Sequence, residues 1–117
     1  MNKFCITKSF SVLETIEFIS NNNERAVFVC DDCNKIIGVV SQGDIIRALI
    51  SGISVYHNIK DIMNINFLYI KEYNLQIAYN LFKTKNITIL PVINDNYEIL
   101  NIITINDIYN FLEEKCL

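Results

Sequence analysis

The chain repeats itself at a fixed interval, and this repeat constrains the fold more than any other feature. When residues 4–54 are written above residues 67–117, Ser41 falls on Thr104, a shift of 63 positions (104 − 41) that needs no gap. Identities are few, but apolar positions match along the whole register. Self-similarity at one period indicates two copies of one supersecondary unit. We therefore expect two similar halves.

Hydrophobic periodicity predicts one order of elements in each copy, namely strand, helix, strand, strand, helix. Ser11 and Glu14 have the spacing of a capping box, and Asn74 is the capping candidate of the second copy. The lone proline, Pro91, is expected to begin or edge its strand. The predicted elements are residues 4–8, 11–23, 25–30, 35–41 and 44–51 in the first copy, and residues 67–71, 74–86, 88–93, 98–104 and 107–115 in the second.

One copy is too small to bury both faces of a three-stranded sheet alone. Two such sheets stacked face to face, with helices outside, would solve that problem. The link "GISVYHNIKDIMN", residues 52–64, contains no flexible Gly/Ser tether. The sequence therefore predicts one pseudo-symmetric α/β (α+β) globule rather than two independent domains.

Composition narrows the class of protein. Hydrophobic residues make up 51% of the 117 residues, which is too many for a disordered chain. The formal charge is -3 without a basic cluster, so a nucleic-acid partner is disfavoured. No apolar run is long enough to predict a membrane span, and the first ten residues lack the apolar core of a signal peptide. A cytoplasmic protein is the expectation.

The four cysteines are Cys5, Cys30, Cys33 and Cys116, and a cytoplasmic setting would keep them reduced. Cys30 and Cys33 form a CxxC pair, which supplies only half of a four-ligand zinc site. The stretch "CDDCNK" is typical of a hairpin turn with one thiol facing the core. A redox or metal switch built on this pair is the alternative.

Four motifs resemble one known family. They are "GVVSQGDI" (38–45) with its counterpart "NIITINDI" (101–108), "LPVIND" (90–95) and "IKDIMN" (59–64). Their spacing resembles a tandem pair of CBS domains, the cystathionine β-synthase module, also known as a Bateman module. The resemblance covers essentially the whole chain. It implies two β-α-β-β-α repeats, 1–58 and 59–117, packed sheet to sheet as one CBS pair.

A narrower likeness concerns residues 41–64. Their glycine before the aspartate, the following arginine and the short "GIS" linker are similar to CBS pairs that precede sugar-nucleotide transferase domains. This likeness implies a regulatory fragment or a stand-alone module whose regulated enzyme is an attached or separate transferase.

Ser41 and Asp44 allow two interpretations. The S-x-x-D spacing is a capping box, worth roughly 1 kcal/mol of helix stability without any ligand. Alternatively, a carboxylate in the first helical turn can accept hydrogen bonds from two ribose hydroxyls, while the helix N-terminus faces a phosphate. The resemblance implies the second role, because CBS pairs commonly bind adenosine nucleotides. Carried over, the positions are Ser41 and Asp44, with Thr104 and Asp107 in the second copy.

The two copies differ in charge. Arg47 lies three residues after Asp44, hence on the same helical face, where it could reach a phosphate or only form an exposed ion pair. The second copy has Asn110 there, and it has Asn101 where the first copy has Gly38. The family prefers glycine where the backbone approaches its ligand. We therefore expect the first cleft to bind better than the second.

The resemblance also implies that the base lies against the ends of strands. Such residues are equally compatible with an ordinary core, and the sequence does not say which ends serve which cleft. The candidates are Ile6, Thr7, Arg25 and Ala26 in the first copy, with Ile70, Thr88 and Ile89 as equivalents in the second.

No nucleophile–base pair, P-loop or metal cluster is visible in the sequence, so an enzyme is not expected and no cofactor is required. The prediction is a regulatory module that senses an adenine nucleotide (AMP, ADP, ATP or a related compound) and controls an attached or partner enzyme. A homodimer through the CBS helices is expected. The alternative is a dimerisation scaffold with degenerate pockets that bind no ligand.

Overall fold

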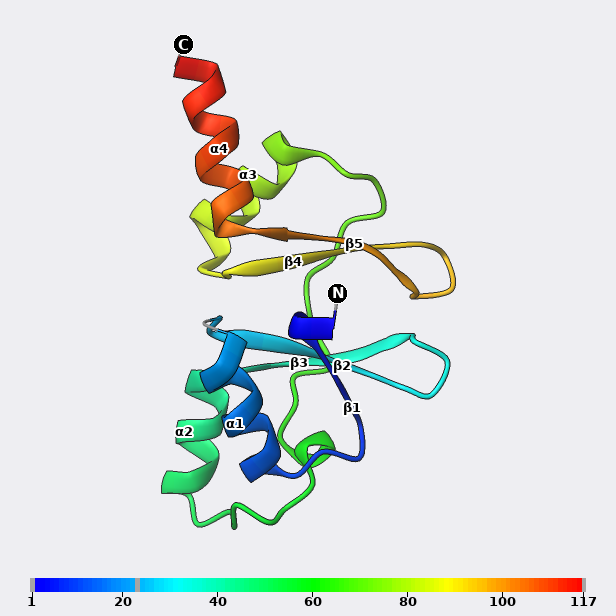
Figure 1. Ribbon diagram of the computed structural model, residues 1–117, viewed down its shortest axis with the longest axis vertical. Helices are drawn as coiled ribbons and strands as arrows, with labels where there is room; N and C mark the ends of the chain where they lie inside the picture. Colours follow the sequence, from blue (N-terminus) through cyan, green and yellow to red (C-terminus); the bar gives the residue numbers. More distant parts are fainter. Residues whose placement is uncertain (1, 23, 117) are drawn as a thin grey trace. The chain divides into compact units, whose positions relative to one another are not determined.

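The computed structural model describes residues 2–22 and 24–116, which leaves residues 1, 23 and 117 outside the description. The chain divides into two compact units, Met1–Phe67 (unit 1) and Leu68–Leu117 (unit 2). Each unit carries its own sheet and its own pair of helices (Figure 1). The mixed α/β class predicted from the sequence is confirmed. The packing of one sheet on the other stays a prediction.

Unit 1 contains a three-stranded sheet in the order β1-β2-β3, with β1 parallel and β3 antiparallel to the central strand. Its two α-helices lie on the same side of this sheet (Figure 1). A short 3-10 turn, η1 (Asn2–Phe4), leads into the sheet. In chain order the main elements are β1 (Cys5–Thr7), α1 (Val12–Asn22), β2 (Ala26–Cys30), β3 (Ile36–Ser41) and α2 (Gln42–Ile50).

The core of unit 1 forms where the two helices cover the sheet. Alternate strand residues and the apolar stripes of both helices meet there, as the period-2 and period-3.6 patterns predict. Helix α1 begins with the predicted capping box, because Ser11 Oγ accepts from Glu14 N–H at 3.1 Å and Glu14 Oε1 accepts from Ser11 N–H at 2.9 Å. The buried core residues are Ile6, Val12, Ile19, Val27, Val29, Val40, Ile45 and Ile59.

The last of these residues comes from the linker, which folds onto unit 1. Ile59 begins the 3-10 turn η2 (Ile59–Asp61) and is fully buried. Farther along, Asn64 exchanges two backbone hydrogen bonds with Val39 at the outer edge of β3, at 3.0 and 2.8 Å. The compact units thus divide after residue 67, whereas the sequence repeats are predicted to divide after residue 58.

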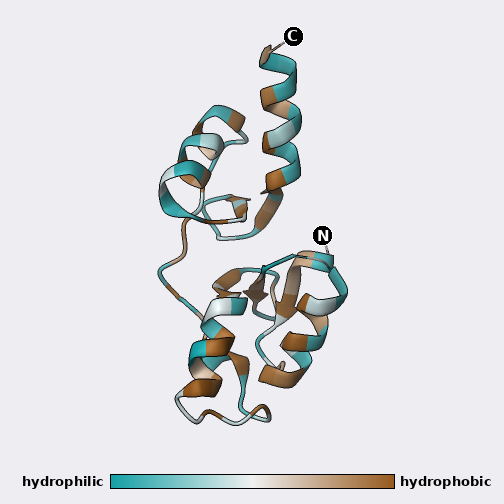
Figure 2. Cartoon of the chain, turned by 90° about the vertical axis from the view of Figure 1, so that its left-hand side faces the viewer, coloured by the Kyte–Doolittle hydropathy of each residue, from teal (hydrophilic) through white to brown (hydrophobic). Residues whose placement is uncertain are grey.

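Unit 2 has a two-stranded antiparallel sheet covered by two helices, α3 (Leu75–Lys85) and α4 (Ile105–Cys116). The strands are β4 (Ile89–Ile93) and β5 (Ile99–Thr104). Hydrophobic and hydrophilic residues alternate around α4, as expected for a helix that buries one face (Figure 2). The core contains Ala78, Leu90, Val92, Ile103 and Ile108.

The strand predicted at residues 67–71 is wrong in extent, because only one isolated bridge, Ile70 to Val92, forms there. Pro91 explains the loss. It lies in the middle of β4, fully buried, rather than at the start of the strand. Its counterpart in unit 1 is Phe28, which pairs with Cys5 of β1. Proline has no N–H to donate, so a parallel strand cannot complete its ladder at this position.

Within the described residues, no helix combines the length and the apolar character that crossing a bilayer would require.

Candidate functional site

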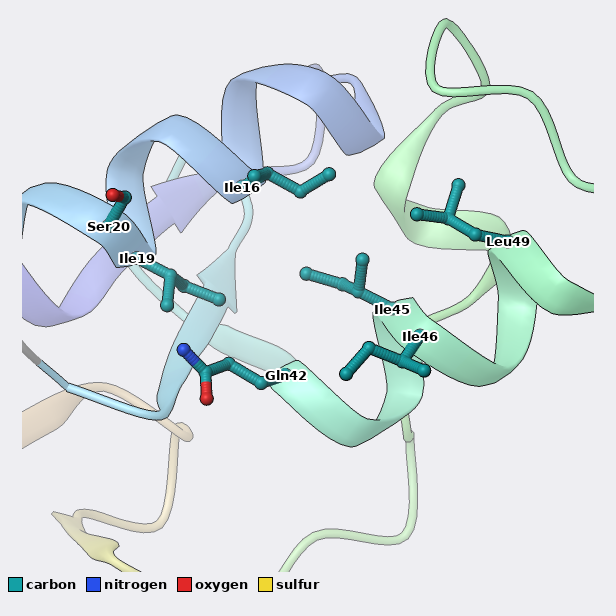
Figure 3. A pocket seen from close by; sticks show the side chains of 7 residues that line it. All are labelled: Ile16, Ile19, Ser20, Gln42, Ile45, Ile46 and Leu49. Atoms are coloured by element: carbon teal, nitrogen blue, oxygen red, sulfur yellow. The ribbon is translucent and has the colours of Figure 1, made fainter.

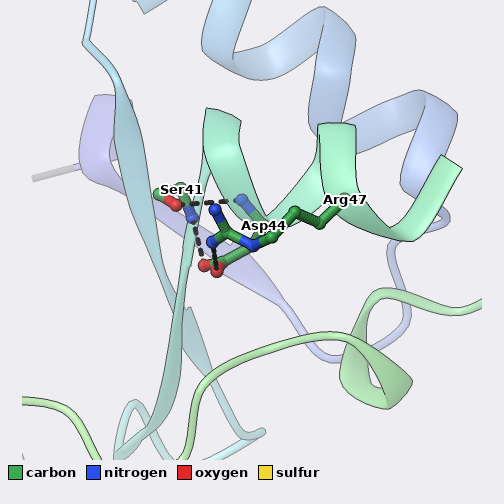
Figure 4. Close-up of polar contacts among 3 residues, drawn as sticks. All are labelled: Ser41, Asp44 and Arg47. Atoms are coloured by element: carbon green, nitrogen blue, oxygen red, sulfur yellow. Dashed lines mark hydrogen bonds and ion pairs between the residues drawn. The ribbon is translucent and has the colours of Figure 1, made fainter. Parts of the chain in front are cut away.

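The start of α2 carries the first candidate site (Figure 4). Ser41 is the N-cap residue, with extended backbone angles, and its Oγ accepts from Asp44 N–H at 3.1 Å. Asp44 Oδ2 in turn accepts from Ser41 N–H at 2.9 Å. The predicted capping box is therefore confirmed. A carboxylate oxygen can accept about two hydrogen bonds, so Asp44 keeps capacity for further donors.

Arg47 folds back along the helix onto Asp44. Its Nη2 donates to Asp44 Oδ1 at 2.8 Å, with 72% of the arginine side chain exposed. An exposed pair of this kind contributes about 0–1 kcal/mol and is easily opened. A Cβ added at Gly43 would lie 3.2 Å from Arg47 Nη1. Glycine at position 43 thus leaves room for the guanidinium beside the N-terminus of the helix.

The start of β2 lies beside this helix end. Ala26 pairs with Ser41 in the sheet, and the carbonyl of Arg25 accepts from Gln42 N–H at 2.9 Å. Ala26 is buried and Arg25 is exposed. The structure therefore brings two of the predicted base-binding positions next to the capping box.

The other two predicted positions of unit 1 do not join them. Ile6 is only 2% exposed and belongs to the core under the helices. Thr7 is exposed but pairs with Cys30, four residues along β2 from Ala26, which corresponds to about 13 Å of strand. Within unit 1, Ile6 has a packing role and Thr7 stands apart from Asp44.

Unit 2 repeats the capping box with a threonine. Thr104 N–H and Oγ1 both lie within hydrogen-bond reach of Asp107 Oδ2, at 2.8 and 3.1 Å, and Asp107 N–H donates to Thr104 Oγ1 at 3.3 Å. Asn110 stands where unit 1 has Arg47, so this helix end lacks the neighbouring guanidinium. Both helix starts therefore present a hydroxyl and a carboxylate, but only that of unit 1 has an arginine beside them.

The remaining predicted residues of unit 2 are divided in the same way as those of unit 1. Ile89 pairs with Thr104, and Thr88 precedes it, so both lie beside the start of α4. Ile70 instead bridges to Val92, three residues farther along β4.

Tyr73 is a neighbour of this site that sequence reasoning missed. Burial, together with the charge of Asp107, raises the pKa of Tyr73, so the ring lies within electrostatic reach of that carboxylate. Half of the tyrosine is exposed. The repeat register aligns Tyr73 with Phe10, and this exchange of phenyl for phenol is the signal that could have drawn attention to it.

Gly38 has a structural explanation that does not involve a ligand. A Cβ added there would lie 2.6 Å from Met63 Sδ and 2.8 Å from Met63 Cγ. The absence of a side chain at position 38 therefore leaves room for Met63 of the linker to pack against the sheet edge. In unit 2, Asn101 bends its side chain to accept from the N–H of Ile102 at 2.8 Å.

An apolar groove of about 470 Å³ lies between α1 and α2 of unit 1 (Figure 3). Ser20 and Gln42 are its only polar lining residues, and none of the predicted nucleotide-binding residues lines it. It borders the capping-box site without containing it. The lining residues are Ile16, Ile19, Ser20, Gln42, Ile45, Ile46 and Leu49.

The CxxC segment forms the predicted turn. Asp31 Oδ1 accepts from Cys33 N–H at 2.8 Å and from Lys35 N–H at 3.0 Å, and these bonds hold the pKa of Asp31 below its usual range. Cys30 is buried, whereas Cys33 is exposed. Across residues 2–22 and 24–116, no cluster of three or more metal-ligating side chains occurs.

Comparison with known proteins gives two kinds of match. The CBS domain family matches residues 1–51 and 59–114. A homoserine O-acetyltransferase from Methanosphaera stadtmanae is 31% identical over 104 residues, covering 88% of this chain and 21% of its own length. The chain spans between 21% and 31% of the length of the curated relatives that it matches.

Solved structures share the fold. The CBS domain protein PAE2072 from Pyrobaculum aerophilum, complexed with AMP, superposes with a TM-score of 0.76 at 19% identity, covering 94% of this chain and 90% of its own. CBSX2 in complex with AMP superposes with a TM-score of 0.80 at 22% identity, covering 97% of this chain and 89% of its own. The two family matches, their repeat spacing and these superpositions agree, and the chain belongs to the CBS domain family as a tandem pair.

Proposed function

We propose that this CBS pair is a regulatory module that binds an adenine nucleotide at the start of α2. The observation that carries the proposal is the joining of Ser41, Asp44 and Arg47 with Ala26 at one end of unit 1. Asp44 supplies acceptors for ribose hydroxyls, and the helix N-terminus favours an anion. Two structures of the same fold are complexes with AMP.

Arg47 provides the phosphate contact in this proposal. Its guanidinium is mostly exposed, and its pairing with Asp44 costs little to open. On binding, the fork of N–H donors would turn from Asp44 to the phosphate, which offers a charge-assisted and bidentate partner. Asp44 is then released to face the ribose.

The start of α4 is the weaker site of the pair in this proposal. Thr104 and Asp107 present the same hydroxyl and carboxylate, but Asn110 cannot attract a phosphate as Arg47 does. A nucleoside or a ligand of lower charge fits this end better than AMP does. Thr88 and Ile89 supply the neighbouring strand edge.

The regulated activity resides in another domain or protein. A ligand changes an equilibrium only by binding one conformation better than another, so the module needs an enzyme whose states it distinguishes. The curated relatives are much longer than this chain, and one of them is named as a homoserine O-acetyltransferase. The likeness of residues 41–64 to CBS pairs that precede transferase domains favours a sugar-nucleotide transferase as the regulated enzyme. The proposed location of the module is the cytoplasm.

The groove between α1 and α2 favours a second function, dimerisation through the CBS helices. Its lining is almost entirely aliphatic, and the lining residue Ile46 is 57% exposed. Ile50, at the end of the same helix, is 81% exposed. Burying such side chains against a second copy would contribute about 1.5–3 kcal/mol each. Light scattering of the protein and of Ile46→Lys tests this, and a monomer at all concentrations would reject it.

Thermal unfolding with AMP, ADP, ATP, S-adenosylmethionine and a sugar nucleotide tests the binding proposal. A ligand at a hundred times its Kd stabilises the folded state by about 2.7 kcal/mol. Asp44→Ala should lose this gain and cost about 1 kcal/mol without ligand, because it also removes the cap. Asp107→Ala should retain most of the response to AMP.

Glu14→Ala is the matched control. It breaks an equivalent capping box at the start of α1, where no ligand is proposed, and its cost should likewise be about 1 kcal/mol. This variant must keep the full response to AMP. An unchanged melting temperature with every nucleotide at saturation, or an equal response in Asp44→Ala and wild type, would leave the dimerisation scaffold as the function.

A further inference from the structure

Two cysteines far apart in the sequence meet on the sheet of unit 1. Strands β1 and β2 are parallel neighbours, with Cys5 opposite Phe28 and Thr7 opposite Cys30. Side chains alternate along a strand, so Cys5 and Cys30 project from the same face of the sheet, opposite to Ile6 and the helices. Each thiol shifts the pKa of the other, as expected for neighbouring side chains on one face.

The interaction between the two thiols affects them in opposite directions. The Cys30 thiol stabilises a thiolate at Cys5, and this lowers the pKa of Cys5 although partial burial opposes the change. The same interaction and its own burial raise the pKa of Cys30. Cys5 is partly exposed, whereas Cys30 is buried. The accessible member of the pair is therefore also the better nucleophile, which is the arrangement of a reactive cysteine.

We propose that Cys5 is an oxidation site for hydroperoxides and that Cys30 is its resolving thiol. The pairing differs from the CxxC pair that the sequence suggests. Cys33 lies exposed on the turn, where Asp31 holds its backbone N–H, and Cys30 lies on the strand beside β1. The structure thus places Cys30 on the same sheet face as Cys5, in the neighbouring strand, whereas Cys33 lies outside the strands.

The reaction has two balanced steps. The Cys5 thiolate attacks one peroxide oxygen, the S–O bond forms as the O–O bond breaks, and the departing hydroxide takes a proton to become water. The sulfur loses two electrons to the peroxide. The Cys30 sulfur then attacks the Cys5 sulfenic acid, the S–S bond forms, and the hydroxyl leaves with the Cys30 proton as a second water.

The first step prepares the second. A thiolate at Cys5 raises the pKa of Cys30 and so favours the protonated form of Cys30. Oxidation of Cys5 to a neutral sulfenic acid removes that charge, so Cys30 deprotonates more readily and becomes the attacking group.

Closing the disulfide would also move a candidate binding residue. Strand β1 is only three residues long and ends at Thr7, two positions from Cys5. A disulfide requires its two Cα atoms to approach within about 7 Å. Because Cys5 and Cys30 are two positions out of register, closing the bond would draw β1 along β2. The effect on Thr7 rests on the proposed nucleotide function, whereas the thiol chemistry does not.

Peptide mapping of the full chain tests the pairing. The reduced protein is treated with hydrogen peroxide, blocked with N-ethylmaleimide and digested with trypsin, which separates residues 4–8 from residues 26–35. The expected product is a disulfide-linked pair of these peptides that carries one N-ethylmaleimide on Cys33. Its mass should be about 2 Da below the sum of the reduced peptide 4–8 and the peptide 26–35 alkylated once. It should persist in Cys33→Ser and vanish in Cys30→Ser. A link that vanishes in Cys33→Ser, or no link at all, would overturn the proposal.

Alkylation kinetics, with no nucleotide present, test whether Cys30 activates the Cys5 thiol. At about pH 6.5, below the usual pKa of a thiol, iodoacetamide should modify Cys5 roughly tenfold more slowly in Cys30→Ala than in wild type. Cys30→Ser keeps a hydroxyl donor and should retain most of the rate. Cys116, which is exposed, is the internal control and should react equally in all three proteins. Equal Cys5 rates in all three would contradict the proposal.

Discussion

Replacing Gly38 with alanine should destabilise the protein by pushing the linker off the sheet. The new methyl group would lie 2.6 Å from Met63 Sδ and 3.2 Å from Met63 Cβ. The methionine side chain must leave its packed position to relieve the contacts of Sδ and Cγ, and the backbone near Met63 must also shift to relieve that of Cβ. That shift strains the two hydrogen bonds between Asn64 and Val39.

The size of the effect follows from these contacts. Forcing an extra methyl group into a packed site typically costs about 1–3 kcal/mol. Weakening two backbone hydrogen bonds falls in the same range, at about 1 kcal/mol each. We expect the free energy of unfolding to fall by about 2 kcal/mol, which lowers the urea midpoint by roughly 1 M.

The energetic coupling between residues 38 and 63 is measured by urea denaturation of four proteins, namely wild type, Gly38→Ala, Met63→Ala and the double variant. Because Met63→Ala removes the clashing sulfur and methylene, the double variant should be more stable than the sum of the single effects predicts, by about 1 kcal/mol. Strict additivity, or a Gly38→Ala protein as stable as wild type, would refute the packing of Met63 against this glycine.

Two smaller predictions concern α2 and the CxxC turn. Gly43→Ala should stabilise the protein by about 0.5–1 kcal/mol in thermal unfolding, because alanine favours the helix and the only close neighbour is the mobile end of Arg47. The folded state depresses the pKa of Asp31, so its contribution to stability should be complete above the unfolded pKa near 3.8 and be lost as the pH falls through the folded value. An NMR titration of the Asp31 carboxyl checks this, and a midpoint at or above 3.8 would contradict it.

Local patterns in the sequence predicted much of the fold. The capping boxes at Ser11, Ser41 and Thr104 could be predicted because each needs only a hydroxyl and an acid three residues apart. The helices and hairpins followed from periods of 3.6 and 2. Because the repeat needs no gap, the prediction of each element in one half also supported the prediction of its counterpart in the other half.

Contacts that depend on a single atom could not be predicted in this way. Residues 67–71 resemble a strand, but the missing N–H of Pro91 reduces the pairing to a bridge at Ile70. Gly38 was assigned to ligand approach on the family's preference, whereas the structure places Met63 over it. Neither contact has a signal in the periodicity.

The candidate site was predicted in part. Ala26 and Arg25 do lie beside Ser41, because β2 begins where β3 ends in an antiparallel pair. Ile6 belongs to the core, since alternation along β1 points it toward the helices, and its role at a nucleotide site stays a prediction. Tyr73 was missed, and so was the proximity of Cys5 to Cys30, because adjacency in the sequence is easier to see than adjacency across parallel strands.

An NMR titration of the isotopically labelled chain with AMP tests the account most directly. Binding at the start of α2 predicts the largest amide shifts at Ala26, Ser41 and Asp44, and smaller ones at Thr104 and Asp107. In Asp44→Ala at the same concentration, the shifts at Ala26 and Ser41 should disappear. Shifts centred on the groove residues Ile16 and Leu49, or a spectrum that AMP leaves unchanged, would contradict the assignment of this helix end as the nucleotide site.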